Sequence, residues 1–116
     1  MTINATLCQI IREDSLLLLK DPGWFGEGKW NGAGGKLVPS ESPEHGVVRE
    51  VEEETGLMLR SVTMHGVLDF YFGEKPEPDW VVHVVSSSDF SGEPLEVSEE
   101  GALRWFRFDE VPLRRP

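Results

Sequence analysis

A short helix with clear signals at both ends is the feature that most constrains this chain. Ser42 is a favoured N-cap residue, Pro43 suits the first helical position, and Gly56 can end a helix in the left-handed conformation. These signals predict a helix from Pro43 to Thr55. The preceding segment, Asp21 to Lys36, holds six glycines and a proline, so we expect a structured loop with short extended pieces there.

The predicted helix has an acidic face and an apolar face. With a turn of roughly 100° per residue, Glu50, Glu53 and Glu54 fall on one side. The stripe that we expect to pack on a sheet consists of Val47, Val48, Val51 and Thr55. Like charges at this spacing repel, so the cluster does not stabilise the helix by itself. Grouped carboxylates suit Mg²⁺ or Mn²⁺ together with phosphates; the simpler interpretation is a solvated, exposed helix.

Apolar segments on both sides of the helix predict a mixed sheet. The strand candidates are residues 5–11, 15–20, 61–74, 80–88 and 103–108. Strands before and after one helix indicate a layered α/β or α+β domain. A chain of 116 residues fits one core, so we expect a single domain over residues 1–116. The aromatic side chains expected in that core are Phe70, Phe72, Trp105 and Phe106.

Charge and cysteine content narrow the classes of function. Lys and Arg total 11 against 21 Asp and Glu, a formal net charge of -10, which argues against binding a nucleic-acid polymer through its phosphates. Cys8 is the single cysteine, so no disulfide framework is expected. Leu16–Leu19 is too short for a membrane span, and no signal-peptide pattern precedes it. We expect a cytoplasmic protein without a membrane partner; the oligomeric state stays open.

The spacing of residues 35–57 matches a known motif. Five residues separate Gly35 from Glu41, and seven more separate Glu41 from the run REVEEETGL. The matching positions are Gly35, Glu41, Arg49, Glu50, Val51, Glu53, Glu54, Gly56 and Leu57. This pattern resembles the Nudix box, so the chain resembles the Nudix hydrolase family. The resemblance implies an α/β/α sandwich with a mixed sheet, and hydrolysis of a nucleoside diphosphate linked to another group.

The resemblance also implies roles for individual residues. Glu50, Glu53 and Glu54 would bind Mg²⁺, or Mn²⁺ in its place, and one of them would serve as base for the attacking water. Gly34 would offer its backbone carbonyl as a further ligand. Arg49 would orient the glutamates through a charge-assisted contact. The residues expected to support the loop are Gly35, Glu41 and Gly56.

A second resemblance concerns the substrate. The stretches GKWNGAGGK, VSEE and LRWFRFDEVP look like the MutT-like branch, which hydrolyses oxidised purine nucleoside triphosphates. In that branch Asn31 would contact the purine through its amide, while Thr6 and Phe25 would line the pocket. Glu100 would be an additional metal ligand. The chain stops shortly after DEVP, so we expect the C-terminal helix of the fold, and the acidic residues that help to select oxidised bases, to be missing.

Other motifs fit the sequence less well. GWFGEGK, residues 23–29, matches the first positions of a phosphate-binding P-loop, but Trp30 stands where Ser or Thr should contact Mg²⁺. The three histidines lack the spacing of zinc ligands. Two classes of function stay open, a metal-dependent nucleotide hydrolase and a catalytically silent nucleotide-binding Nudix module. ADP-ribose and dinucleoside polyphosphates are the competing substrates within the enzyme class.

Overall fold

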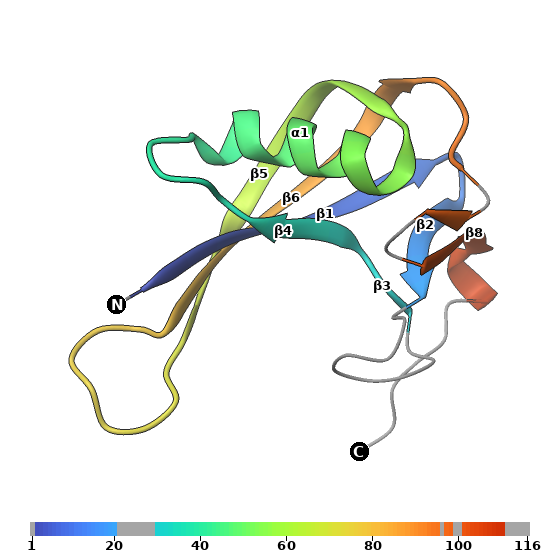
Figure 1. Cartoon of the computed structure of the whole chain (residues 1–116). Helices are drawn as coiled ribbons and strands as arrows, with labels where there is room; N and C mark the ends of the chain where they lie inside the picture. The colour runs from blue at the N-terminus through green and yellow to red at the C-terminus, as the bar shows by residue number, and fades with distance from the viewer. Residues whose placement is uncertain (1, 21–29, 96, 99–100, 111–116) are drawn as a thin grey trace.

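A mixed β-sheet with one α-helix lying across it forms the body of the protein (Figure 1). The computed structural model describes residues 2–20, 30–95, 97–98 and 101–110. The elements are β1 (Ile3–Arg12), β2 (Ser15–Lys20), β3 (Trp30–Asn31), β4 (Ala33–Lys36), α1 (Pro43–Thr55), β5 (Met58–Phe70), β6 (Trp80–Ser91), β7 (Val97–Ser98), β8 (Gly101–Arg107) and the 3-10 helix η1 (Phe108–Glu110). Within the described part of the chain, no helix has the length and apolar character needed to cross a membrane.

β1 is the central strand of the sheet. The strand order is β5-β6-β1-β2-β8-β7, with β3 beside β2 and β4 beside β1. β1 and β6 run parallel, whereas the other pairs are antiparallel, so the predicted mixed sheet is confirmed. Because β2 and β4 share the β1 edge opposite β6, the glycine-rich β4 lies next to the start of β1.

The helix has the predicted bounds and the predicted caps. The hydroxyl of Ser42 accepts a hydrogen bond from the backbone N–H of His45 at 3.1 Å, and Pro43 opens the helix. Gly56 adopts a φ of 83°, and its N–H donates to the carbonyl of Glu52 at 2.9 Å. These contacts satisfy backbone groups that a helix end otherwise leaves unpaired.

The core lies between α1 and the sheet. The helix contributes Val47 and Val51, both without solvent exposure, and Thr55 is equally buried beside them. From the strands and the turn after the helix come Cys8, Ile10, Leu17, Ala33, Leu57, Leu59 and Val85. The apolar stripe predicted for the helix therefore packs as expected, and burial raises the pKa of the Cys8 thiol to about 12.

Two of the four aromatic residues expected in the core lie outside it. Phe106 is buried and Trp105 packs against the core, but Phe70 and Phe72 are 42% and 64% exposed. Phe70 ends β5, the edge strand of the sheet, most of whose side chains are covered on neither face, and Phe72 lies beyond the end of that strand. Its pairing with β6 also contains three register shifts, between Leu59 and Gly66.

Gly34 marks a close approach of β4 to β1. It pairs with Leu7 and has a φ of +156°, which disfavours residues with a side chain. A Cβ atom at this position would lie 2.8 Å from the carbonyl carbon of Thr6 and 3.0 Å from the Cα of Leu7. Only glycine therefore lets β4 pair with β1 at this distance.

Gly34→Ala is expected to destabilise the fold by ~2 kcal/mol more than Gly66→Ala. Gly66 is the matched control because its φ is +158°, yet a Cβ there would meet no atom within 4 Å. Both variants carry the same backbone strain, and only Gly34→Ala adds the collision with β1. Urea unfolding of the two variants measures the difference, and equal losses of unfolding free energy would contradict the packing argument.

Candidate active site

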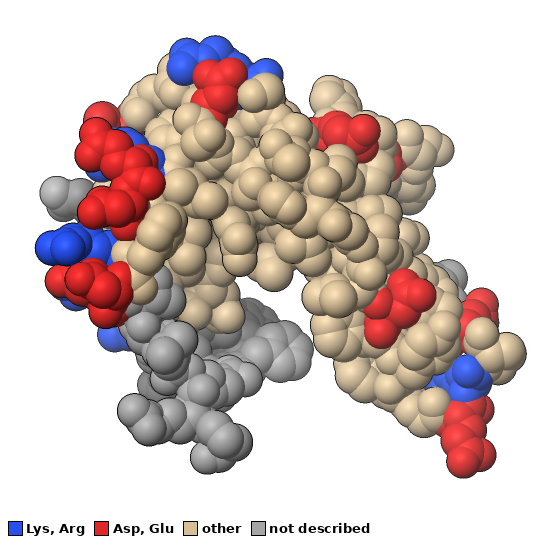
Figure 2. Space-filling view, turned by 180° about the vertical axis from the view of Figure 1, so that it is seen from behind, with Lys and Arg blue, Asp and Glu red and all other residues tan. Residues whose placement is uncertain are grey.

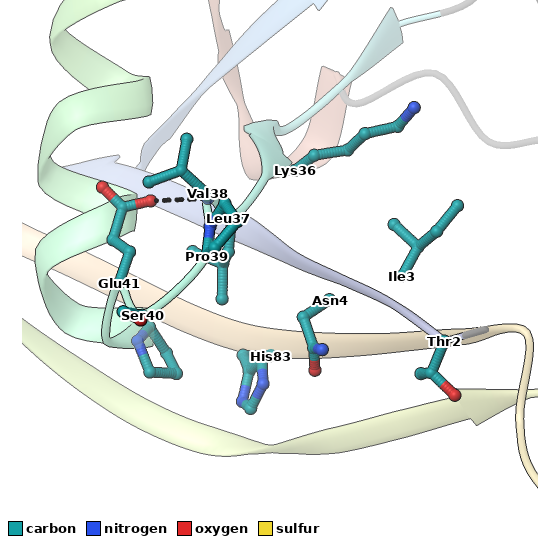
Figure 3. A pocket seen from close by; sticks show the side chains of 11 residues that line it. Thr2, Ile3, Asn4, Lys36, Leu37, Val38, Pro39, Ser40, Glu41 and His83 are labelled. Carbon is teal, nitrogen blue, oxygen red and sulfur yellow. Dashed lines mark hydrogen bonds between the residues drawn. The ribbon is translucent and has the colours of Figure 1, made fainter.

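The loop between β4 and α1 is fixed by a two-point ion pair. Arg49 Nε donates to Glu41 Oε2 at 2.8 Å, and Arg49 Nη2 donates to Glu41 Oε1 at 2.9 Å. The backbone N–H of Val38 adds a third hydrogen bond to Glu41, at 3.1 Å (Figure 3). The side chain of Glu41 is only 7% exposed. The hydrogen bonds from Arg49, which favour the charged carboxylate, lower the pKa of Glu41 to about 2.

Arg49 also contacts two of the three glutamates of the acidic face. Its Nη1 lies 2.9 Å from a carboxylate oxygen of Glu50 and 3.3 Å from Glu53. Its Nη2 donates to the backbone carbonyl of Lys36 at 3.3 Å. The hydrogen bond to Glu41 is the main cause that raises the pKa of Arg49, so the guanidinium stays charged. One cation thus holds three carboxylates and the end of β4.

Glu50 lies against the backbone of β4. Its side chain is 14% exposed, and a Cβ on Gly35 would stand 2.7 Å from its carboxyl carbon. Burial raises the pKa of Glu50, although the neighbouring guanidinium of Arg49 opposes that shift. The absence of a side chain at Gly35 therefore leaves space for the Glu50 carboxylate.

Glu54 points inward, whereas Glu53 points to solvent. The backbone N–H of Gly34 donates to Glu54 Oε1 at 2.7 Å, and Glu54 is 9% exposed. The Glu53 side chain is 59% exposed. The difference follows from helix geometry, because Glu54 lies next to the buried positions Val51 and Thr55 on the helix surface. The acidic face predicted from the sequence is thus divided between a buried and an open carboxylate.

The donors in this cluster fit a hard divalent cation. Among the described residues, Glu41, Glu50 and Glu53 surround one guanidinium, and Glu54 lies beside them on the Gly34 N–H, so negative charge is in excess there. Within residues 2–20, 30–95, 97–98 and 101–110, no three His, Cys, Asp or Glu side chains are grouped so as to hold a metal ion by themselves. Mg²⁺ commonly uses one or two carboxylates and completes its shell with water and substrate phosphates. The predicted ligand Glu100 lies outside the described residues.

A cavity of about 390 Å³ adjoins the acidic cluster. It is lined by Ala5, Thr6, Leu7, Gly32, Gly34, Gly35, Lys36, Leu68, Phe70, Trp80 and Val82. Gly34 and Gly35 form part of its wall and also contact Glu54 and Glu50. Seen from behind, the middle of the described surface consists of uncharged side chains, and most acidic and basic groups lie toward its margins (Figure 2).

The structure brings together some of the predicted substrate residues and separates others. Thr6 lines the cavity, and its buried hydroxyl has no hydrogen-bond partner among the described residues. Asn31 is exposed on β3 and does not line the cavity, although the next residue, Gly32, does. Phe25 lies outside the described residues. Gly56 ends α1 and is not part of the cavity wall.

Sequence reasoning did not identify the far wall of the cavity. Leu68 and Phe70 come from β5, and Trp80 and Val82 come from β6. The short segment between these two strand candidates, residues 75–79, contains two prolines and implies that the strands pair, and the structure places Phe70 opposite Trp80. The sequence therefore indicated that β5 and β6 pair. It did not indicate which face of this hairpin forms the cavity wall, because that depends on how β6 lies beside β1.

A second hollow, of about 580 Å³, lies beside the start of α1 (Figure 3). Asn4, Pro39, Ser40 and His83 line it together with Glu41. Neither hollow is lined by Glu50, Glu53 or Glu54, but this one also lacks Gly34 and Gly35, whose backbone adjoins Glu54 and Glu50. It is therefore not the hollow in which the acidic cluster and the glycine backbone of β4 meet.

Comparisons with known proteins agree with this geometry. The NUDIX domain family matches residues 1–116. The oxidized purine nucleoside triphosphate hydrolase of Mus musculus is 37% identical over 108 residues, covering 93% of this chain and 68% of that protein. The hydrolase of the same name from Danio rerio is 37% identical over 109 residues, with the same coverage.

A solved structure shows the same fold. The crystal structure of a MutT NUDIX hydrolase from Burkholderia pseudomallei has a TM-score of 0.83 and 34% identity, covering 98% of this chain and 89% of that one. It supports the α/β/α sandwich expected for the fold, to which the described residues contribute the mixed sheet and α1. With the family match over residues 1–116 and the glutamate-rich helix beside β4, the chain belongs to the Nudix family as a MutT-like hydrolase of phosphoanhydride bonds.

Proposed function

We propose that this protein is a Mg²⁺-dependent nucleoside triphosphate pyrophosphohydrolase that favours oxidised purine nucleotides, and that residues 1–116 form one catalytic domain. The observation that carries the proposal is the wall shared by the cavity and the acidic cluster. Gly34 and Gly35 line the cavity on one side and contact Glu54 and Glu50 on the other. A nucleotide whose base occupies the cavity can therefore extend its phosphates toward the carboxylates.

The cavity suits a nucleobase. Its walls are largely apolar, with Leu68, Phe70, Trp80 and Val82 on one side. A purine can stack on such aromatic rings, an interaction worth about 1–3 kcal/mol per base in other proteins. The Thr6 hydroxyl is buried and has no partner among the described residues. Because buried polar atoms are normally hydrogen-bonded, we expect it to turn toward a polar group of the bound ligand. Asn31 would add its amide from the neighbouring strand.

The acidic cluster suits the phosphates once a cation is bound. We assign Glu50, Glu53 and Glu54 as ligands of Mg²⁺, with Mn²⁺ as the alternative, and expect the Gly34 carbonyl and Glu100 to complete the set. A bound Mg²⁺ would polarise the phosphoryl oxygens and lower the pKa of a coordinated water. Arg49 orients Glu50 and Glu53 through the contacts described above, while Gly35, Glu41 and Gly56 keep the loop and helix in place.

The proposed reaction is a substitution at phosphorus. The oxygen of a water molecule forms a bond to phosphorus while a P–O bond of the phosphoanhydride breaks, which gives the nucleoside monophosphate and pyrophosphate. The proton of the water passes to a carboxylate of the cluster, with Glu50, Glu53 and Glu54 as the candidates for this base. The names of the Mus musculus and Danio rerio relatives support oxidised purines as the preferred substrates.

Product analysis after incubation of 8-oxo-dGTP, dGTP and ADP-ribose with Mg²⁺ tests the substrate. The two triphosphates would give a nucleoside monophosphate and pyrophosphate, whereas ADP-ribose would give AMP and ribose 5-phosphate. We expect 8-oxo-dGTP to have the highest kcat/KM, with 8-oxo-dGMP as the second product. Equal kcat/KM for 8-oxo-dGTP and dGTP would refute the preference for oxidised purines and leave the hydrolase intact. Binding without turnover of all three would identify a catalytically silent module instead.

Glu53→Gln and Glu54→Gln are each expected to lower kcat by about 100-fold or more, because each removes a charge that the transition state requires. Glu52→Gln is the matched control, since it removes the same charge from the exposed position that directly precedes Glu53 on α1. Its kcat should stay within about twofold of the unsubstituted protein, and EDTA should abolish turnover in all cases. Similar losses in all three variants would show that only the overall charge of the helix matters.

A further inference from the structure

We propose that Asp79 is a positioning residue for the base of the substrate, and that it acts through the two aromatic side chains of the cavity wall, Phe70 and Trp80. The inference rests on the proposed nucleotide function and deepens it. It assigns the geometry of the base cavity to a residue that does not line the cavity and is not part of the acidic cluster.

The wall that Phe70 and Trp80 form lies at the root of a long loop. Phe70 is the last residue of β5 and Trp80 is the first residue of β6, and residues 71–79 connect them. In Figure 1 this loop (yellow) extends beyond the sheet on the side where the N-terminus lies. Tyr71 and Phe72 are exposed, so burial of their rings contributes little to holding the loop. Other contacts are needed if Phe70 and Trp80 are to keep a fixed separation.

The carboxylate of Asp79 supplies two such contacts within the loop. Its Oδ2 accepts a hydrogen bond from the backbone N–H of Phe72 at 2.8 Å, and its Oδ1 accepts one from Lys75 Nζ at 2.6 Å. These hydrogen bonds, that of Lys75 first, lower the pKa of Asp79, so the carboxylate is charged at neutral pH. One side chain therefore ties the start and the middle of the loop to its end.

The backbone of Asp79 holds the end of the loop on two strands. Its N–H donates to the carbonyl of Phe70 at 2.8 Å, and its carbonyl accepts a hydrogen bond from the N–H of Ile3 at 2.9 Å. Trp80 follows directly and is paired with Phe70 on one side and with Ile3 on the other. The position of the Trp80 ring therefore depends on how firmly Asp79 is held.

A wall that is already fixed in the free protein lowers the cost of binding a base. Ordering a loop or a side chain when the ligand binds costs free energy that a preorganised site avoids. Asp79 precedes Trp80 in the chain and is hydrogen-bonded to Phe70, so loosening it should affect both rings together. Its contacts lie on the hairpin and on β1, so its loss should leave cation binding at the acidic cluster unchanged.

Equilibrium binding of dGMP and of Mn²⁺ separates the base cavity from the acidic cluster. Asp79→Ala removes both contacts of the carboxylate, whereas Asp79→Asn keeps an oxygen for the Phe72 N–H. Lys75→Met removes only the ion pair. Each probe is titrated by calorimetry, dGMP in EDTA and Mn²⁺ in metal-free buffer, and urea unfolding of each variant confirms that it is folded.

Asp89→Ala is the matched control because Asp89 joins the same two strands at the other end of the hairpin. Its carboxylate accepts hydrogen bonds from Arg60 Nε at 2.8 Å and from the Ser61 hydroxyl at 3.1 Å. None of these three residues lines the cavity. The control therefore loosens the pairing of β5 with β6 and leaves the loop between them intact.

We expect Asp79→Ala to raise Kd for dGMP about tenfold and to change Kd for Mn²⁺ by less than about twofold. Asp79→Asn and Lys75→Met should each stay within about threefold for dGMP, because the Phe72 hydrogen bond remains and a partly exposed ion pair contributes little. Asp89→Ala should leave both Kd values within about twofold. During turnover, Asp79→Ala should raise KM for the nucleotide and leave kcat within about twofold.

Four results would overturn the inference. They are unchanged dGMP affinity in Asp79→Ala, an equal loss of dGMP affinity in Asp89→Ala, a loss in Asp79→Ala that extends to Mn²⁺, and failure of the unsubstituted protein to bind dGMP. A protein that shows the expected binding pattern but hydrolyses no nucleotide with Mg²⁺ would refute the proposed reaction and leave the role of Asp79 supported.

Discussion

The ion pair between Arg49 and Glu41 is the contact on which the site depends. Glu41 is buried, and a buried carboxylate is costly unless it is paired and hydrogen-bonded. Arg49 satisfies it at two points and then reaches Glu50, Glu53 and the end of β4. One guanidinium therefore fixes the position of the loop, the orientation of the helix and the spacing of the carboxylates. A guanidinium can contact several carboxylates at once because its N–H groups are arranged as a planar fork, which the ammonium group of lysine lacks. This explains why the motif has an arginine and not a lysine at this position.

Local features of the site were predictable from the sequence. The helix bounds from Pro43 to Thr55 follow from the caps, which act over a single turn. The acidic and apolar faces follow from the helical period. The family followed from spacing along the chain, and it is shown by the comparisons. Each of these depends on residues that are near one another in sequence.

Features that depend on distant contacts were not predictable in the same way. Glu54 turns inward because β4 supplies the Gly34 N–H, 20 residues away. Phe70 is exposed because β5 ends the sheet, which depends on strand order and not on the strand itself. Trp80 faces the cavity because β6 pairs with β1 in one parallel register, and a shift by one residue would turn its side chain to the other face. The composition of a strand alone does not specify its place in the sheet or its register.

The register shifts in β5 have a consequence for how the protein behaves in a concentrated solution. An edge strand of 13 residues with exposed apolar side chains such as Val67 and Leu68 is a template on which a second chain can add a strand. Bulges put the free N–H and C=O groups out of line and increase the local twist. A straight strand can therefore match only a short part of β5 at a time. The irregular pairing therefore disfavours edge-to-edge association over residues 59–66, whereas Val67 and Leu68 lie beyond the last register shift.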